Sequence, residues 1–115
     1  MAKYVFVVLS NSVSDDVDEE FNEWYSEIHV PDFLQFDSVL SARRFTRAEH
    51  QFLPSDDALG RRYLAIYEVE TDDPAALFED VHAARVDGRI RPTETIQRDP
   101  PPITMLFELT EGPVS

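Results

Sequence analysis

The order of apolar runs and helical stretches constrains this chain more than any other feature of its sequence. Residues 3–9, 39–47, 61–70 and 103–109 are rich in β-branched and aromatic residues, which predicts four strands. One helix is predicted after the first strand and another after the third, and residues 48–60 form a loop. The order βαββαβ favours an α+β, ferredoxin-like fold, in which a four-stranded antiparallel sheet carries both helices on one face.

The first helix is predicted from its start signal and its apolar spacing. Ser14, Asp15 and Asp16 offer N-cap oxygens, and the acidic run that continues to Glu20 suits the positive end of a helix. Apolar residues then recur at i, i+4, i+7 and i+11, which predicts one buried stripe. The stripe consists of Val17, Phe21, Trp24 and Ile28.

The second helix is marked at both ends. Asp73 is the predicted N-cap, Pro74 suits the first helical position, and Gly88 can adopt the left-handed conformation that ends a helix. The inner stripe is predicted to consist of Leu77, Val81 and Ala84.

The first and third strands are apolar on both faces, although the two helices can cover only one face of the sheet. The second face therefore needs another cover. A second copy of the same sheet is the simplest one, so we expect a homodimer. The 115 residues themselves suffice for a single domain, 1–115.

Charge and composition limit the classes of binding partner and of functional site that are expected. The net charge of −13 disfavours nucleic acid and anionic membranes, because phosphates would be repelled. RNA-recognition motifs share the predicted topology, but they surround their stacking aromatics with basic residues, which this chain lacks. The absence of cysteine excludes disulfides, thiolate metal sites and cysteine nucleophiles. The apolar run near the start is too short to span a bilayer and lacks a cleavage site, which predicts a cytoplasmic protein.

Neither a metal nor a nucleotide cofactor is expected. With only three glycines, the chain has no phosphate-binding loop. His50 falls in a polar loop and His82 on a helix flank, where it is expected to be solvated. No two histidines share a helix at the i, i+4 spacing of a zinc site.

The segment from Tyr25 to Asp32 contains the best candidate site. Tyr25, His29 and Asp32 follow the spacing i, i+4, i+7 and would share a face of an unbroken helix. Pro31 is expected to interrupt the helix, which places His29 at a helix C-terminus that favours its protonated form. A carboxylate beside an imidazole can orient a general base. The alternative is that His29 and Asp32 only cap the two helical turns.

Two further features leave alternatives open. Trp24 belongs to the predicted core stripe, although an indole can also line a cavity wall. Arg43 and Arg44 lie on opposite faces of the second strand, so at least one is expected to point inward. A buried guanidinium needs a carboxylate or an anionic ligand, and Glu68 on the third strand is the expected partner of Arg44.

From its first strand to residue 109, the chain resembles the EthD-like branch of the dimeric α+β barrel superfamily. The residues that carry the resemblance are Trp24, Tyr25, His29, Pro31 and Asp32, then Arg43, Arg44 and Phe45, and finally Tyr67 and Glu68. The resemblance implies a homodimer whose two sheets form a shared barrel with the helices outside. Relatives include muconolactone isomerases, aromatic polyketide cyclases and cofactor-free monooxygenases, which favours a site at His29 over a cap.

We therefore expect a small cofactor-independent enzyme, of isomerase, cyclase or lyase type, acting on a hydrophobic aromatic, lactone or polyketide-like carbonyl compound. His29 is expected to shuttle a proton and Asp32 to orient its imidazole. Tyr25 or Tyr67 is expected to donate a hydrogen bond to the developing enolate.

Trp24 and Phe6 are expected to supply apolar walls for that compound, and Arg43 or Arg44 to contact it. One alternative is a non-catalytic module that binds such a compound or serves a pathway as an accessory. Another is a purely structural dimer, in which backbone carbonyls satisfy His29.

Overall fold

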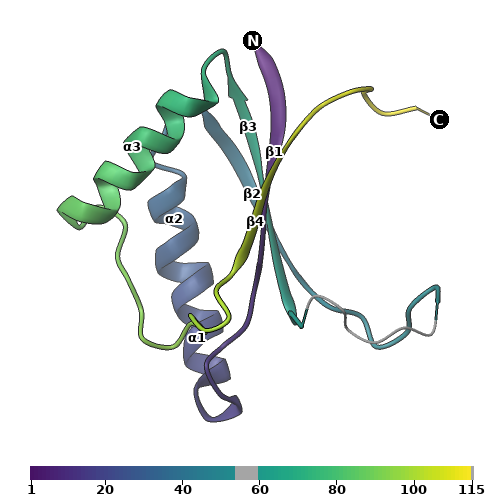
Figure 1. Cartoon of the computed structure of the whole chain (residues 1–115), viewed down its shortest axis with the longest axis vertical. Coiled ribbons are helices and arrows are strands. Elements are labelled where there is room, and N and C mark those ends of the chain that lie inside the picture. Colours follow the sequence, from purple (N-terminus) through teal and green to yellow (C-terminus); the bar gives the residue numbers. More distant parts are fainter. Residues whose placement is uncertain (54–59, 115) are drawn as a thin grey trace.

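The four predicted strands form one antiparallel sheet in the computed structural model of the chain, which describes residues 1–53 and 60–114. The strands pair in the order β2-β3-β1-β4, the order of a ferredoxin-like fold, and Figure 1 shows how they twist across one another. Their bounds are β1 Ala2–Ser10, β2 Val39–Thr46, β3 Tyr63–Thr71 and β4 Ile103–Glu108. The predicted fold class is confirmed, whereas residues 54–59 of the predicted loop lie outside the described residues.

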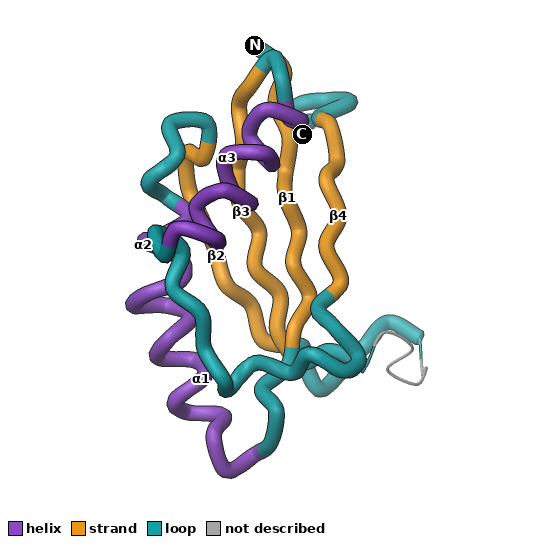
Figure 2. The backbone as a smooth tube through the Cα atoms, turned by 60° about the vertical axis from the view of Figure 1, so that its left-hand side comes forward, coloured by secondary structure: helices purple, strands orange, loops and turns teal. Residues whose placement is uncertain are grey.

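All helical segments lie on one face of the sheet (Figures 1 and 2). The first helical region is built from the short turn η1 Asp15–Val17, α1 Asp18–Trp24, η2 Tyr25–His29 and α2 Val30–Phe33. The second is α3 Pro74–Asp87. After α3, the chain runs past the first helical region before it enters β4 (Figure 1). Within the described residues, no helix has the length and apolar character needed to cross a membrane.

The helix α3 matches its sequence signals closely. The Asp73 carboxylate accepts a hydrogen bond from the Ala76 N–H at 3.1 Å, and Gly88 ends the helix with φ of 86°. The predicted inner stripe of Leu77, Val81 and Ala84 is buried.

The first helical region departs from its prediction at both its start and its middle. Ser14 occupies the predicted N-cap position of η1, but its side chain makes no capping hydrogen bond. Pro31 does not break the helix. Instead, η2 is a π-helical turn in which the Val30 N–H donates to the Tyr25 carbonyl, five residues back. A wide turn suits this position, because proline cannot donate a bond and clashes with the carbonyl of an α-helix four residues back.

The π-turn also changes which residues are buried. Phe21 and Tyr25 are 0% and 1% exposed and Phe33 is 7% exposed, whereas Trp24 and Ile28 are only partly buried. The predicted stripe is thus wrong at Trp24, whose place on the buried face is taken by Tyr25. The extra residue in the turn rotates the following positions relative to an α-helix, which keeps Phe33 on the buried face with Tyr25.

A register shift decides which side of the sheet the β2 side chains take. Val39 pairs with Val69, but Ser41 pairs with Glu68, so one extra residue is inserted between the two pairs. Such a bulge moves every later side chain to the opposite face. Beyond it, Arg44 pairs with Ala65 on the helix side, whereas Arg43 pairs with Ile66 on the open side.

The open side of the sheet carries a large apolar patch and is covered by no described residue (Figure 1). Cross-strand partners share a face, so the pairings of β1 with β3 and β4 define this surface. Its apolar residues are Val5, Val7, Leu9, Phe45, Leu64, Ile66, Ile103, Met105 and Phe107. We call them the open face.

Candidate functional site

A cavity of about 810 Å³ lies between the sheet, the two helical regions and the segment that follows α3. Its volume falls in the usual range for small-molecule sites. Aromatic and aliphatic side chains from β1, α1, η2, α2 and α3 form much of its wall. Phe6, Trp24, Tyr25 and His29, four of the predicted site residues, line it.

His29 stands among three aromatic rings at the cavity wall. Its imidazole stacks on Trp24 with a centroid distance of 4.6 Å, and its centroid lies 4.9 Å from that of Tyr25 and 5.6 Å from that of Phe33. Burial is the main cause that lowers the pKa of His29 to about 4. The negative charge of Asp32 partly offsets this shift, and the positive charges of Arg85 and Arg44 add to it. The imidazole is therefore neutral at pH 7. The prediction that His29 lies at a helix C-terminus, where its protonated form is favoured, is wrong, because the π-turn continues the helix past His29.

Several buried polar atoms around His29 have no hydrogen-bond partner among the described residues. Among the described residues, no hydrogen-bond partner meets the buried His29 Nδ1, Tyr25 hydroxyl or Trp24 Nε1. The same holds for the Tyr67 hydroxyl and Arg44 Nε. Buried polar atoms in folded proteins nearly always have partners, so a cluster without them is a candidate for a functional site.

Tyr25 and Tyr67 form the inner part of this cluster. Burial raises the pKa of both hydroxyls, and each tyrosine also perturbs the pKa of the other. Their hydroxyls are thus close, although they do not meet at hydrogen-bond geometry. Tyr25 lines the cavity, whereas Tyr67 does not and packs against Phe33 at a ring distance of 4.6 Å.

Asp32 has a different partner from the one expected. Its carboxylate accepts hydrogen bonds from the Arg91 backbone N–H at 2.9 Å, from Arg91 Nε at 3.1 Å and from Arg91 Nη2 at 2.7 Å. These bonds hold the pKa of Asp32 below its usual range. No hydrogen bond joins Asp32 to His29 among the described contacts, and Asp32 does not line the cavity. The carboxylate fixes the segment after α3 to α2 instead of orienting the imidazole.

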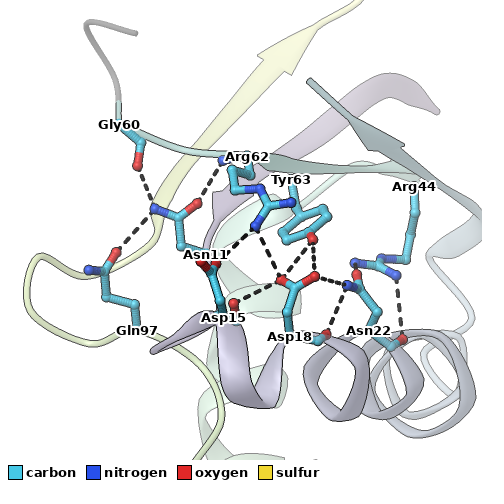
Figure 3. Close-up of polar contacts among 10 residues, drawn as sticks. Asn11, Asp15, Asp18, Asn22, Arg44, Gly60, Arg62, Tyr63 and Gln97 are labelled. Carbon is cyan, nitrogen blue, oxygen red and sulfur yellow. Dashed lines mark hydrogen bonds and ion pairs between the residues drawn. The ribbon is translucent and has the colours of Figure 1, made fainter. Parts of the chain in front are cut away.

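Arg44 is the inward arginine, but the protein itself supplies its partners (Figure 3). Its Nη2 donates to Asn22 Oδ1 at 2.8 Å and its Nη1 to Ser26 Oγ at 2.9 Å. Its guanidinium also lies 4.4 Å from the centre of the Tyr25 ring. Arg44 therefore holds α1 and η2 against β2 and does not line the cavity.

The predicted Arg44–Glu68 pair is wrong, since the bulge in β2 places the two side chains on opposite faces. Arg43 is the residue near Glu68, at 3.6 Å on the open side, with 71% and 49% of their side chains exposed. Arg43 therefore does not reach the cavity either.

The sequence interpretation missed the cationic part of the cavity wall. Arg85 and His82 from α3 line it, as do Arg91 and Arg98 from the segment after α3. His82 is exposed, as expected for a helix flank, but it lies at the cavity rim. The signal available in the sequence was the recurrence of arginine in residues 85–98 of an otherwise acidic chain. No group of three or more potential metal ligands is found within the described residues.

Comparison with known proteins places the chain in a family. Residues 4–91 match the model of a domain of unknown function, DUF4286. The chain belongs to the DUF4286 family. No curated protein matches it.

Two solved structures share the fold of this DUF4286 chain. One is a dimeric ferredoxin-like protein of unknown function from Thermobifida fusca YX, with 12% identity, a TM-score of 0.56 and coverage of 94% of this chain and 92% of that chain. The other is an EthD family protein from Bacillus halodurans C-125, with 10% identity, a TM-score of 0.57 and coverage of 96% and 100%. They confirm the predicted EthD-like, ferredoxin-like fold, and at these identities they show the fold alone.

Proposed function

We propose that the cavity binds a small hydrophobic aromatic, lactone or polyketide-like carbonyl compound, and that His29 moves a proton on it without a cofactor. The observation that carries the proposal is a pair of buried polar groups without a partner among the described residues, His29 Nδ1 and the Tyr25 hydroxyl, on two side chains that line the cavity. A ligand carbonyl and its neighbouring C–H supply the missing partners once a small movement of these side chains opens the two atoms to the cavity. Phe6 and Trp24 then pack against the ring of the compound.

The chemistry follows from the neutral state of His29. Its imidazole accepts the proton from the carbon next to the carbonyl, and the electron pair of that C–H bond moves onto the carbonyl oxygen as an enolate. The Tyr25 hydroxyl donates a hydrogen bond to this oxygen. The imidazolium returns the proton to the same carbon or to another position of the enolate, and the second outcome is an isomerisation.

A second candidate function is a non-catalytic binding module. It is favoured by the lowered pKa of His29, about 4, because a base that weak removes protons from carbon slowly at pH 7. In this case, His29 and Tyr25 only hydrogen-bond to the ligand.

We also propose that the functional unit is a homodimer. The open face is a continuous apolar surface on the side of the sheet away from the helices, as expected for an interface between two sheets. The solved structure from Thermobifida fusca, which shares the fold, is described as dimeric. The cavity lies on the other side of the sheet, so each copy keeps its own site.

Hydrogen–deuterium exchange on a simple ketone separates catalysis from binding. α-Tetralone is incubated with the protein in D₂O, and loss of the α-proton signal is followed by NMR. We expect exchange above the buffer rate that falls by about 10²-fold or more in His29→Asn, the typical loss of a general base. His50→Asn, in an exposed loop away from the cavity, is the matched control. An exchange rate that is equal in His29→Asn and wild type would contradict the proton-transfer role of His29. The non-catalytic binding module would then be the remaining candidate function.

A further inference from the structure

Charge is distributed unevenly between the cavity and the rest of the molecule. The chain has 23 Asp and Glu residues against 10 Lys and Arg. Among the described residues that line the cavity, however, there is no Asp or Glu, while three are arginines and two are histidines. A cavity that served only neutral compounds would not need this exclusion of acidic side chains.

Two of the three arginines are occupied by the protein. Arg91 binds the Asp32 carboxylate through Nε and Nη2, and Arg98 Nη2 donates to the Thr93 carbonyl at 2.6 Å. These two residues tie the segment after α3 into place.

Arg85 differs from them, since it has no hydrogen-bond or ion-pair partner among the described residues. The sequence of α3 explains this. On a helix, a side chain meets those three and four positions away, and for Arg85 these are Val81, His82, Gly88 and Arg89. None of them is acidic. The nearby Asp87 is engaged by Arg89, through Nε at 2.8 Å.

Arg85 is also close enough to the catalytic candidate to act on it. Its positive charge is one of the causes that lower the pKa of His29. An anion bound at Arg85 offsets that charge and so raises the pKa of the imidazole. A ligand with its own anionic group therefore makes His29 a stronger base when it binds.

We propose that Arg85 is an anion-binding residue of the cavity, and that the natural ligand is an aromatic or polycyclic acid with its ring system on Trp24, Phe6 and Phe33 and its carboxylate on Arg85. The inference rests on the proposed function, since both use the same cavity. It narrows the ligand class from hydrophobic carbonyl compounds in general to those that carry a carboxylate. It also explains how a protein with a net charge of −13 admits an acid, because the only charged side chains among the described lining residues are cationic or titrate to cations.

Displacement of a neutral fluorescent probe tests the two proposals separately. N-phenyl-1-naphthylamine reports occupation of the apolar cavity, and 2-naphthoate and methyl 2-naphthoate compete for it. The two competitors share one ring system and differ in charge. We expect 2-naphthoate to displace the probe at a concentration about tenfold lower than its ester. Added salt is expected to weaken binding of the acid more than binding of the ester, because salt screens the charge of the exposed guanidinium.

The variant Arg85→Gln is expected to remove the preference for the acid. Its affinity for 2-naphthoate should fall by about tenfold, and its affinities for the ester and the probe should stay within about twofold of wild type. Arg62→Gln changes the net charge equally, but Arg62 pairs with Asp15 and does not line the cavity, so this control keeps the preference. Probe binding with no preference for the acid, or equal effects of the two variants, would overturn the anion site and leave the cavity proposal standing. Failure of the probe to bind would contradict both.

Discussion

The two faces of the sheet differ in which kind of group is left without a partner. On the helix-covered face, the core side chains are buried beside a cavity, and a group of polar atoms around His29 and Tyr25 has no hydrogen-bond partner among the described residues. On the open side, charged side chains such as Arg43 and Glu68 are solvated, and what no described residue covers is apolar surface, with Phe107 51% exposed. In the proposed function, a small ligand with rings and polar atoms binds on the first face, and a second copy of the sheet covers the second. The comparison teaches that the two proposals concern opposite faces of the sheet and can be tested separately.

The largest expected effect is on the open face. Val7 lies at its centre, paired with Ile66 on one side and Met105 on the other. Val7→Asp is expected to weaken dimerisation by about 100-fold or more, because a charge buried without a partner costs several kcal/mol. Sedimentation at micromolar concentration should show a dimer for wild type and a monomer near 13.2 kDa for the variant.

The control for this change is Val86→Asp, on the outside of α3, where the side chain is 90% exposed. It should remain dimeric. A wild-type monomer, or a dimer of Val7→Asp as stable as wild type, would contradict the role given to the open face.

Carboxylates on the two faces should differ in their effect on stability. Asp32→Asn on the helix-covered side is expected to cost about 1–3 kcal/mol of unfolding free energy, because a buried carboxylate loses charge-assisted bonds from Arg91. Glu68→Gln on the open side breaks a 3.6 Å solvent-exposed pair and should cost less than about 0.5 kcal/mol. Urea unfolding of both variants measures the two losses of unfolding free energy. Equal losses would contradict the difference expected between the buried and the exposed carboxylate.

A smaller effect is expected from the pH dependence of His29. Its pKa falls from 6.5 to about 4 on folding, so between these values the unfolded chain binds more protons than the folded one. This contribution to stability is complete above pH 6.5 and is lost as the pH falls towards 4. Relative to His29→Asn, wild type should lose about 1–2 kcal/mol between pH 6.5 and pH 5. Parallel stability curves for the two proteins would show that the imidazole is not buried in its neutral form.

The strands, the second helix and the apolar open face could be predicted from the sequence because each depends on local signals. Asp73, Pro74 and Gly88 mark α3 by capping chemistry that acts within a few residues. Alternation of side chains along β1 likewise shows that both of its faces are apolar.

The parts of the site that could not be predicted depend on irregularities and on contacts between distant segments. The bulge before Ser41 reverses the faces of Arg43 and Arg44, and no residue type marks it. The π-turn at Tyr25–His29 adds a residue to one helical turn, which the spacing of apolar residues did not reveal. The pairing of Asp32 with Arg91 joins residues that are far apart in the sequence, so Asp32 could be identified as notable but not assigned its partner.

The most direct test of the central claim is whether a ligand in the cavity touches His29. The chain has three histidines, so ¹³C labelling of their Cε1 carbons gives a spectrum with one resonance each. On titration with N-phenyl-1-naphthylamine, the His29 resonance should shift by the ring current of the probe and saturate with the affinity found by fluorescence. The resonance of His50, in its exposed loop, should stay in place. A His29 resonance that does not move while the probe saturates the protein would show that the ligand lies elsewhere, and the account of the helix-covered face would fail.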